Sequence, residues 1–550
     1  MTTRQLGPPD AGELSEATGA AKDSVVVAGW TVVSRVTGVV RVAAIGAVLG
    51  PTFFSNAFQF ANTLPNLIFY TFLAGSLFSS LLVPALVGRI DAADRAGIRQ
   101  LAGGFLGVSL LALGLIVPLA IAGGPVVLRL AAGGHPGATP NSQVVWLMIL
   151  LLPQVFLYAV VGTASSVMNA HRRFALAAAA PAFENCGILL VLVATAVFYG
   201  TGVRPEGVPP GELFLLGLGS TGAVVCHAAA QWWGARRVGV LLVPRAGWRD
   251  REVLVLVRRA LPSLGQAGLF GLQVLTMLVV VSRVPGGVVA FQVAMNFYAL
   301  PLAVGATPVA LALLPRLARL HRQGEYVAFR DTLLRGIALA LFLTVPAALG
   351  YIALAHPLAS TVAVGRMGTT QSVDMVAAAI AAMAPAVVAQ TIFLICTYES
   401  YARQDTRTPM RAMLLQAAVC LGVAPVALML HGSAVPLCLG LGYSLAVLIS
   451  ATMLAVKLGR RLGDGEQRLR PAVMRIGAAG LLMIVPVSLT ASVVAHAVPG
   501  RPGSTLALVL GTAVGCAVFV GLQLFWRAPE LAWVTGNFGR RRPLDAVCPR

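Results

Sequence analysis

Charged residues are scarce in this chain. Asp, Glu, Lys and Arg make up 11% of its 550 residues, and lysine occurs only at Lys22 and Lys457. A soluble chain of this length divides into several domains with charged surfaces, and this composition cannot cover such surfaces. The scarcity of charge therefore excludes a soluble globular protein and indicates that most of the surface faces lipid.

Sequence motifs for metal, redox or hydrolytic chemistry are also missing. The seven cysteines form no C-x-x-C pair, and all but Cys548 lie in apolar segments, so we interpret them as small core residues. The stretch from Gly217 to Gly222 matches G-x-G-x-x-G, but it lies within an apolar run with no strand before it. These small residues are expected to let helices pack closely. We predict no catalytic residues, no metal site and no cofactor.

The net charge of +20 does not indicate nucleic-acid binding. The basic residues are scattered through short loops between apolar runs. That distribution is typical of the cytoplasmic loops of a membrane protein. We expect membrane lipids around the chain and no nucleic-acid partner.

Long apolar runs dominate what is present. Hydrophobic residues make up 57% of the chain, and its mean hydropathy is +0.83. A bilayer core of about 30 Å needs about 20 apolar residues per helix, and lipid cannot satisfy an open strand edge. The runs are continuous rather than alternating, so they do not suit a barrel. We predict an all-α polytopic membrane protein of about fourteen transmembrane helices. The predicted segments are 25–49, 56–87, 101–122, 144–168, 176–199, 212–234, 260–282, 288–315, 334–355, 375–398, 411–430, 434–456, 475–495 and 504–526.

Arginine alternates between successive loops. If the N-terminus is cytoplasmic, the outer loops hold only Arg129, Arg204, Arg283, Arg366 and Arg501, and the inner loops hold the other loop arginines. The positive-inside rule then places both termini in the cytoplasm of a bacterial cell, with the chain in its inner membrane. The N-terminal residues lack the basic region of a cleavable signal, so the first apolar segment is expected to stay as a signal anchor.

A weak repeat has a period of six helices. Residues Phe58–Pro65 are similar to Phe291–Pro301, and the basic turns Asn169–Arg173 and Tyr401–Asp405 follow the fourth and tenth segments. Six is even, so the two halves share one orientation. Chance similarity between apolar sequences is the alternative. The predicted organisation is a disordered cytoplasmic tail (1–24), an N-terminal six-helix lobe (25–235), a cytoplasmic linker (236–259), a C-terminal six-helix lobe (260–458), two extra transmembrane helices (474–526) and a basic cytoplasmic tail (527–550).

Two arginines lie inside the first apolar segment, which contains no acidic residue. Arg35 and Arg41 each cost about 2.5–3.5 kcal/mol at mid-membrane depth unless a cavity or partner compensates the charge. They are separated by about 9 Å along a helix axis, a distance that long side chains can bridge. The guanidinium fork suits phosphate oxygens, so both are candidate substrate contacts. Alternatively, Arg41 extends to the outer surface, or both pair with Glu184.

Glu184 is the carboxylate that lies well inside an apolar segment, and such a group is paired or protonated. It is a candidate counter-ion for Arg35, a candidate proton-coupling group, or a structural partner. Amides in apolar surroundings suggest a hydrated central cavity, although each could instead form an interhelical hydrogen bond. They are Asn56, Asn62, Asn66, Gln231, Gln266, Gln273, Asn296, Gln390 and Gln416. Prolines within the segments are candidate hinges or static kinks.

At these residues the chain resembles the MurJ/MviN family, the lipid II flippases of the multidrug/oligosaccharidyl-lipid/polysaccharide exporter superfamily. Ser34–Arg41 is similar to the family's S-R-x-x-G-x-x-R opening, and Leu64–Leu67 to its second-helix signature. Met168–Ala170 is similar to its turn after helix four, and Tyr401–Pro409 to its turn after helix ten, which is the most specific match. The resemblance spans roughly residues 25 to 460.

The chain departs from the family pattern at several positions. Asn56 stands where the family usually has Asp, and Asn296 falls at the position of a cavity arginine in helix eight. Phe69 and Tyr70 replace a basic pair, and Ala74 replaces the acid that follows it. The cavity has therefore lost positive and negative charges together.

The resemblance implies two six-helix lobes around a central cationic cavity, with two extra helices. It also implies export of an undecaprenyl-pyrophosphate-linked cell-wall precursor, lipid II by default, by alternating access. Arg35 and Arg41 would contact the pyrophosphate, and Asn56, Asn66 and Asn296 are further substrate-binding candidates. The implied partners are the lipid-linked saccharide and cell-wall synthesis proteins. Two alternatives stay open: an antiporter that exports a drug or amphiphilic metabolite, and a non-transporting scaffold.

Overall fold

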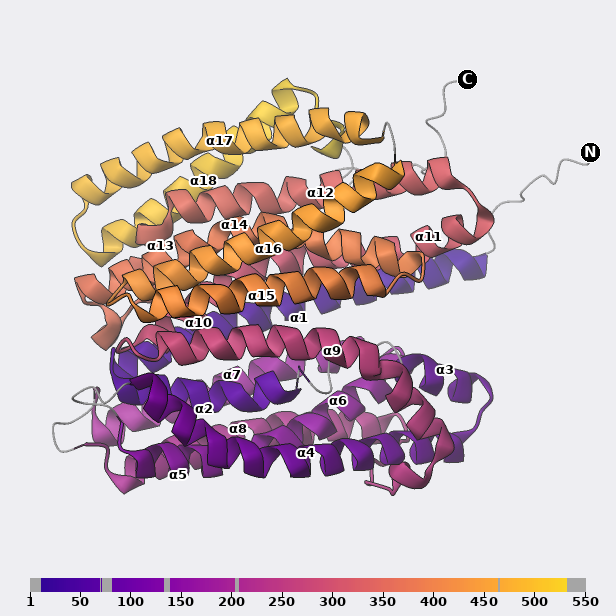
Figure 1. The fold of residues 1–550 in the computed structure, drawn as a ribbon, viewed down its shortest axis with the longest axis horizontal. Coiled ribbons are helices and arrows are strands. Elements are labelled where there is room, and N and C mark those ends of the chain that lie inside the picture. The colour runs from indigo at the N-terminus through magenta and orange to yellow at the C-terminus, as the bar shows by residue number, and fades with distance from the viewer. Residues whose placement is uncertain are drawn as a thin grey trace, which may run out of the picture.

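The computed structural model describes residues 11–69, 71, 82–132, 139–202, 207–462 and 465–531. Every regular element among them is helical, which confirms the all-α fold class. The helices lie roughly side by side along the long axis of the molecule, and the start of α1 and the end of α18 lie at the same end (Figure 1). In chain order the elements are α1 (Ala11–Leu49), α2 (Phe53–Phe69), α3 (Val83–Asp91), α4 (Arg95–Ala132), α5 (Asn141–Leu151), α6 (Gln154–Ala170), α7 (Phe174–Tyr199), α8 (Pro210–Arg237), η2 (Gly247–Arg249), α9 (Arg251–Val281), α10 (Gly287–Pro301), η3 (Leu302–Ala306), α11 (Thr307–Gln323), α12 (Tyr326–Ala353), α13 (Ala355–Val362), η4 (Gly365–Met367), α14 (Thr370–Ala402), α15 (Arg407–Leu428), α16 (Ala434–Leu462), α17 (Gly465–Ala497) and α18 (Arg501–Phe525).

The described residues contain 13 helices that are long and apolar enough to cross a membrane. Thirteen of the predicted segments have a counterpart among them, including the fifth at Phe174–Tyr199. The second predicted segment corresponds to α2 and α3, and residues 70 and 72–81 between them lie outside the described residues. The chain is therefore a multi-pass membrane protein, as its apolar runs predict.

The helices gather into two groups. Helices α2 to α8 lie on one side of the bundle and α10 to α16 on the other, while α17 and α18 lie outside the second group (Figure 1). Helix α1 packs against α7 in the first group and α10 in the second. Helix α17 packs against α18 and α12. The exact boundaries of the two lobes and of the linker stay a prediction.

The basic turns after α6 and α14 have the same backbone geometry. Arg172 has φ 56° and Gln404 has φ 62°, and each is the fourth residue of its turn. The next N–H reaches back five residues in both cases, from Arg173 to the carbonyl of Met168 at 2.8 Å and from Asp405 to the carbonyl of Ser400 at 2.9 Å. This is the Schellman ending of a helix. The shared geometry supports the predicted six-helix repeat.

A second pair of helix ends follows the same rule. Ala93 after α3 has φ 54°, and Gly324 after α11 has φ 73°. The N–H of Asp94 bonds to the carbonyl of Arg89 at 2.9 Å, and that of Glu325 to the carbonyl of Leu320 at 3.1 Å. Both helix ends close the segments in which the repeat was first recognised, so the repeat extends to how these helices terminate.

Small residues in α8 allow close helix packing, as expected from the G-x-G-x-x-G stretch. A Cβ atom on Gly217 would lie 2.6 Å from Leu150 Cδ1, and one on Gly219 would lie 2.7 Å from Val191 Cγ2. Both distances are too short for a side chain. Gly222 has no such neighbour within 4 Å. Two of the three glycines therefore serve helix contact, and the stretch lies inside a helix rather than in a phosphate-binding loop.

The cysteines are not all core residues, which corrects one expectation. Cys396 and Cys420 are buried, but Cys186, Cys226 and Cys516 lie on exposed helix surfaces. Cys548 lies outside the described residues. An apolar segment does not distinguish these cases, because the lipid-facing side of a membrane helix is as apolar as its packed side.

The eighth predicted segment contains a π-helical turn directly after a proline. Helix α10 ends at Pro301, the π-helical turn η3 follows over Leu302–Ala306, and α11 then continues to Gln323. Proline removes one backbone donor, and a π turn accommodates the resulting gap in the hydrogen-bond ladder. This is a local break of the kind expected at a hinge.

Candidate substrate cavity

A polar cavity of about 490 Å³ lies between the two groups of helices. Helices α1, α2, α6, α7 and α8 form most of its wall, and α10 contributes from the second group. Its polar lining comprises Ser34, Arg35, Arg41, Thr63, Asn66, Tyr158, Ser165, Ser166, Asn169, Glu184, Asn185, His227, Gln231, Gln292 and Asn296. The amides and arginines of the sequence analysis therefore meet in one space to a large extent.

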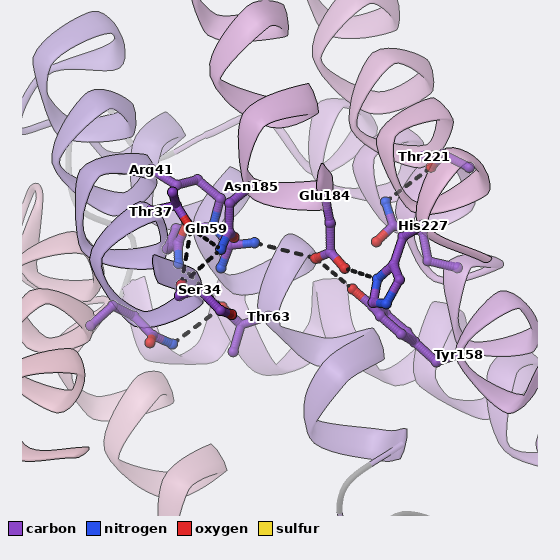
Figure 2. Close-up of polar contacts among 12 residues, drawn as sticks. Ser34, Thr37, Arg41, Gln59, Thr63, Tyr158, Glu184, Asn185, Thr221 and His227 are labelled. Atoms are coloured by element: carbon purple, nitrogen blue, oxygen red, sulfur yellow. Dashed lines mark hydrogen bonds and ion pairs between the residues drawn. The ribbon is translucent and has the colours of Figure 1, made fainter. Parts of the chain in front are cut away.

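Glu184 is the centre of a polar cluster in the cavity wall (Figure 2). Its Oε1 atom lies 3.4 Å from Arg41 Nη1 and accepts a hydrogen bond from the Tyr158 hydroxyl at 2.8 Å. Its Oε2 atom lies 2.9 Å from His227 Nδ1. The carboxylate side chain is 7% exposed. A buried carboxylate needs such partners because desolvation otherwise disfavours its charge.

The geometry sets the tautomer of His227. A carboxylate only accepts hydrogen bonds, so Nδ1 of His227 carries a hydrogen and donates it to Glu184 Oε2. The other ring nitrogen, Nε2, is buried and has no hydrogen-bond partner among the described residues. Likewise Arg41 Nε is buried without a partner in that part of the chain. The cluster thus keeps one unused basic nitrogen and one unused donor.

Arg35 occupies a different position from Arg41. It lines the cavity and is exposed, and the described residues provide it with no ion pair and no hydrogen bond. Of the candidate pairings, the structure shows that of Glu184 with Arg41 and not with Arg35. Arg41 also does not extend to the outer surface, since its side chain is 16% exposed and points to Glu184. Six residues of helix separate the two arginines and turn them to different sides of α1.

Asn185 fixes α1 against α7 beside this cluster. Its Nδ2 atom donates to the Ser34 carbonyl at 3.1 Å and to the Thr37 hydroxyl at 3.0 Å. These contacts lie one helical turn or less from both arginines. They hold the rotation of α1, and therefore the direction in which Arg35 and Arg41 extend.

The opposite wall joins the two groups of helices. Thr63 on α2 accepts hydrogen bonds from Gln59 at 3.3 Å and from Gln292 on α10 at 3.2 Å. Asn66 and Asn296 line the same wall, and Asn296 donates to the Gln292 carbonyl at 2.8 Å. Two of the three predicted asparagine contacts therefore face the cavity.

Asn56 is not among the residues that line this cavity, and its role as a substrate contact stays a prediction. Its Nδ2 atom donates to the carbonyls of Ser282 at 3.0 Å and Val284 at 2.7 Å. Its Oδ1 atom accepts from the Val288 N–H at 3.0 Å. The amide is 2% exposed, and its hydrogen-bonding groups are occupied at the end of the bundle opposite the start of α1. In this conformation Asn56 ties α2 to the start of α10.

Other predicted cavity amides instead join α9 to helices of the second group. Gln416 donates to Gln273 at 3.1 Å and accepts from Ser450 at 3.2 Å, and Gln266 accepts from Tyr401. Gln231 in α8 does line the cavity. Some of the predicted amides therefore line a cavity and others form interhelical hydrogen bonds, and hydration of the cavity stays a prediction. Tyr70 and Ala74, where the family pattern has charged residues, lie outside the described residues.

Sequence reasoning missed Tyr158 and His227. Both lie in apolar runs and both contact Glu184, 26 and 43 residues away in the chain. A titratable ring inside an apolar segment was the available signal for His227, the same signal that identified Glu184. Nothing in the neighbourhood of Tyr158 distinguishes it from an ordinary membrane-helix tyrosine.

These features define a multi-pass membrane transporter fold with a cationic cavity between two helix groups. Solved structures support the fold. A lipid II flippase MurJ in an inward closed conformation has a TM-score of 0.71 at 16% identity, covering 92% of this chain and 99% of the other. An inward-facing multidrug resistance MATE family transporter of the MOP superfamily has a TM-score of 0.57 at 14% identity, covering 81% and 94%.

Sequence comparison then identifies the family. The family described as lipid II flippase MurJ matches residues 45–510. The probable lipid II flippase MurJ of Vibrio cholerae is 26% identical over 71% of this chain and 74% of its own length. That of Bdellovibrio bacteriovorus is 27% identical over 91% and 94%. The chain belongs to the lipid II flippase MurJ family. A flippase is a transporter, so membership indicates a non-enzymatic role.

Proposed function

We propose that the chain flips a polyprenyl-diphosphate-linked cell-wall precursor, lipid II by default, from the cytoplasmic to the outer leaflet by alternating access. The names of its relatives and the cationic cavity support this proposal. Both termini would then lie in the cytoplasm, as the arginine pattern predicts. Cell-wall synthesis proteins are the expected protein partners of such a transporter.

The observation that supports the proposal most directly is the position of Arg35 in the cavity without an ion-pair partner among the described residues. Its guanidinium lines a membrane-embedded cavity without a counter-charge among the described residues. An arginine at such depth is disfavoured by about 2.5–3.5 kcal/mol unless water or a ligand solvates it. A phosphate offers paired oxygens that match the guanidinium fork. We propose Arg35 as the first phosphate contact and Arg41 as the second.

The charge of the cavity favours an anion. Arg35 and Arg41 are positive and Glu184 is negative, so these three side chains give the wall an excess of one positive charge. Asn66 and Asn296 add neutral donors and acceptors that suit phosphate or saccharide oxygens. A cationic drug would meet a carboxylate already paired with Arg41. The drug-exporter alternative, which the likeness to MATE transporters suggests, is therefore less favoured than the flippase.

Alternating access requires contacts that open on one side while others form on the opposite side. At the end away from the start of α1, Asn56 binds the Ser282–Val288 segment, and the Gly286 N–H donates to the Thr52 carbonyl at 3.3 Å. The arginine pattern assigns this end to the outer surface. These contacts would seal the cavity from outside and would break when the substrate is released.

A transport assay tests the proposal. The full chain is reconstituted into vesicles, and movement of a fluorescent polyprenyl-diphosphate-linked saccharide between leaflets is measured beside efflux of a cationic amphiphilic dye. We expect the anionic lipid to move and the dye to stay. Movement of the dye alone would favour the exporter, and movement of neither would favour a scaffold.

A further inference from the structure

We infer that His227, paired with Glu184, is a proton-binding site that takes up a proton when a phosphate engages Arg41. The inference rests on the proposed function and deepens it, because it makes the proton a second ligand of the same cavity. It would link flipping to the pH on each side of the membrane.

The surroundings of Glu184 leave few alternatives. Helix α7 packs against α1, α6 and α8. The titratable groups that face its carboxylate are Arg41 from α1, Tyr158 from α6 and His227 from α8, and Arg35 lines the same cavity from α1. Arg41 supplies the sole permanent positive charge in contact with this carboxylate among the described residues.

The contact between Arg41 and Glu184 can be displaced. It is a single hydrogen bond of 3.4 Å, near the long limit for such a bond, and Arg41 Nε has no partner within the described part of the chain. A phosphate in the cavity could accept from both guanidinium nitrogens, which is the stronger geometry. Phosphate therefore competes with Glu184 for Arg41.

Displacement leaves Glu184 with neutral donors only. A buried carboxylate that loses its cation is strongly disfavoured. One proton removes that penalty. It enters from the water of the cavity and binds the lone pair on His227 Nε2, which has no partner among the described residues. The product is an imidazolium that holds Glu184 through Nδ1–H at the 2.9 Å contact already present. One N–H bond forms and no other covalent bond changes.

Charge balance leads to the same conclusion. Before protonation the wall has two arginines against one carboxylate, an excess of one positive charge. Protonated His227 raises the excess to two, which matches the two phosphates of a diphosphate. By linkage, phosphate binding then promotes proton uptake, and a proton already bound strengthens phosphate binding to the same degree.

Proton counting tests the inference. Calorimetry measures binding of a polyprenyl-diphosphate-linked saccharide, whose esterified diphosphate does not itself titrate in this range, to the full chain in detergent micelles, in two buffers with different ionisation enthalpies, between about pH 5.5 and 8.5. We expect uptake approaching one proton per diphosphate over part of this range. Within that range, the affinity for the diphosphate should weaken by up to about tenfold for each unit that the pH rises, which is the limit for one linked proton.

Three variants locate the proton. His227→Asn keeps a donor in the place of Nδ1 and removes the basic nitrogen, so it should bind diphosphate without proton uptake. Glu184→Gln removes the charge that the proton compensates and should also lose the uptake. His496→Gln changes an exposed histidine at the end of α17 and should keep it.

Each outcome is decisive. Diphosphate binding by the unmodified chain without proton uptake would overturn this inference and leave the proposed function intact. Uptake that persists in both His227→Asn and Glu184→Gln would also overturn it. If one of these variants fails to fold, the other decides. No diphosphate binding at any pH would overturn the proposed function, and this inference with it.

Discussion

Arg41 Nη1 lies 3.4 Å from Glu184 Oε1, and this pair joins α1 to α7 through two residues that are 143 positions apart in the sequence. The pair offsets part of the cost of placing either charge in the membrane interior. It also separates the two arginines of α1 into different roles. Arg41 is held by the wall of the cavity, whereas Arg35 lines the cavity without an ion-pair partner among the described residues.

The ion pair predicts an unequal response to mutation. Arg41→Gln leaves a buried carboxylate with neutral partners, which should lower the free energy of unfolding by as much as about 3 kcal/mol. Glu184→Gln should cost less, because Arg41 remains partly exposed to the cavity. The double variant should recover part of the loss. Heat-induced unfolding in detergent measures all three.

Arg35 provides the matched control for this comparison of the two single variants with the double variant. Combining Arg35→Gln with Glu184→Gln should give nearly additive changes in stability, because the partners of Glu184 are Arg41, Tyr158 and His227 and no hydrogen bond or ion pair joins it to Arg35. Strong coupling of Glu184 to Arg35 rather than to Arg41 would contradict the pairing seen here.

Arg35 should matter for transport more than for stability. Arg35→Ala should abolish flipping of the labelled lipid without lowering the unfolding temperature, because no protein partner is lost among the described residues. Arg35→Lys keeps the charge but not the fork, so transport should persist weakly. Arg319→Ala on α11, an exposed arginine that is not among the cavity-lining residues, is the control. Full transport by Arg35→Ala would exclude a phosphate-binding role.

Asn56 should control access from the outer end. Asn56→Asp replaces a donor with an oxygen that faces the carbonyls of Ser282 and Val284, which repels rather than binds. The cavity should then open outward more often. A cysteine at Ser165, in the cavity lining, reports this as faster labelling by an impermeant thiol reagent added from outside. Asn56→Asp without that cysteine gives the background labelling of the natural cysteines. If Asn56→Asp does not change the rate at which the cysteine at Ser165 is labelled, Asn56 does not seal the outer end.

Asp405 should make stability depend on pH in the acidic range. Burial opposes its ionisation, but two hydrogen bonds from Thr408 and the charges of Lys457 and Arg461 outweigh burial and lower the pKa of Asp405. A lowered pKa in the folded state means that ionised Asp405 stabilises the protein above about pH 4, its unfolded value, and that this stability disappears as the pH falls through the folded value.

The test compares unfolding temperatures across pH. Asp405→Asn should be less stable than the unmodified chain near neutral pH, and the difference should shrink below about pH 4. Asp91→Asn is the control, since Asp91 is exposed and forms no ion pair within the described residues. A difference that stays constant down to strongly acidic pH would show that the Asp405 charge does not contribute.

Topology can be tested independently of transport. Reporter fusions at residue 135, after α4, and at residue 245, before α9, should lie outside and inside, respectively. The expectation follows from the arginine pattern and from the three predicted segments, an odd number, that lie between residues 135 and 245. Reporters that lie on the same side would disprove the fourteen-helix topology.

The sequence alone determined the fold class and the chemical character of the chain. Apolar runs of the right length force helices because lipid offers backbone groups no hydrogen-bond partner. Local motifs also predicted backbone geometry. The turns Asn169–Arg173 and Tyr401–Asp405 were recognised as related, and their backbones end in the same left-handed residue. Arg35, Arg41 and Glu184 were identified because an intramembrane charge is costly wherever it lies.

Only the tertiary structure decided which of these groups meet. It paired Glu184 with Arg41 rather than Arg35, added Tyr158 and His227, and placed Asn56 away from the cavity. In soluble helices the apolar stripe shows which side is buried, but lipid makes both sides of a membrane helix apolar. The rotation of each helix is therefore weakly encoded in its own sequence. It is set by contacts such as those of Asn185 with Ser34 and Thr37, between residues 151 and 148 positions apart.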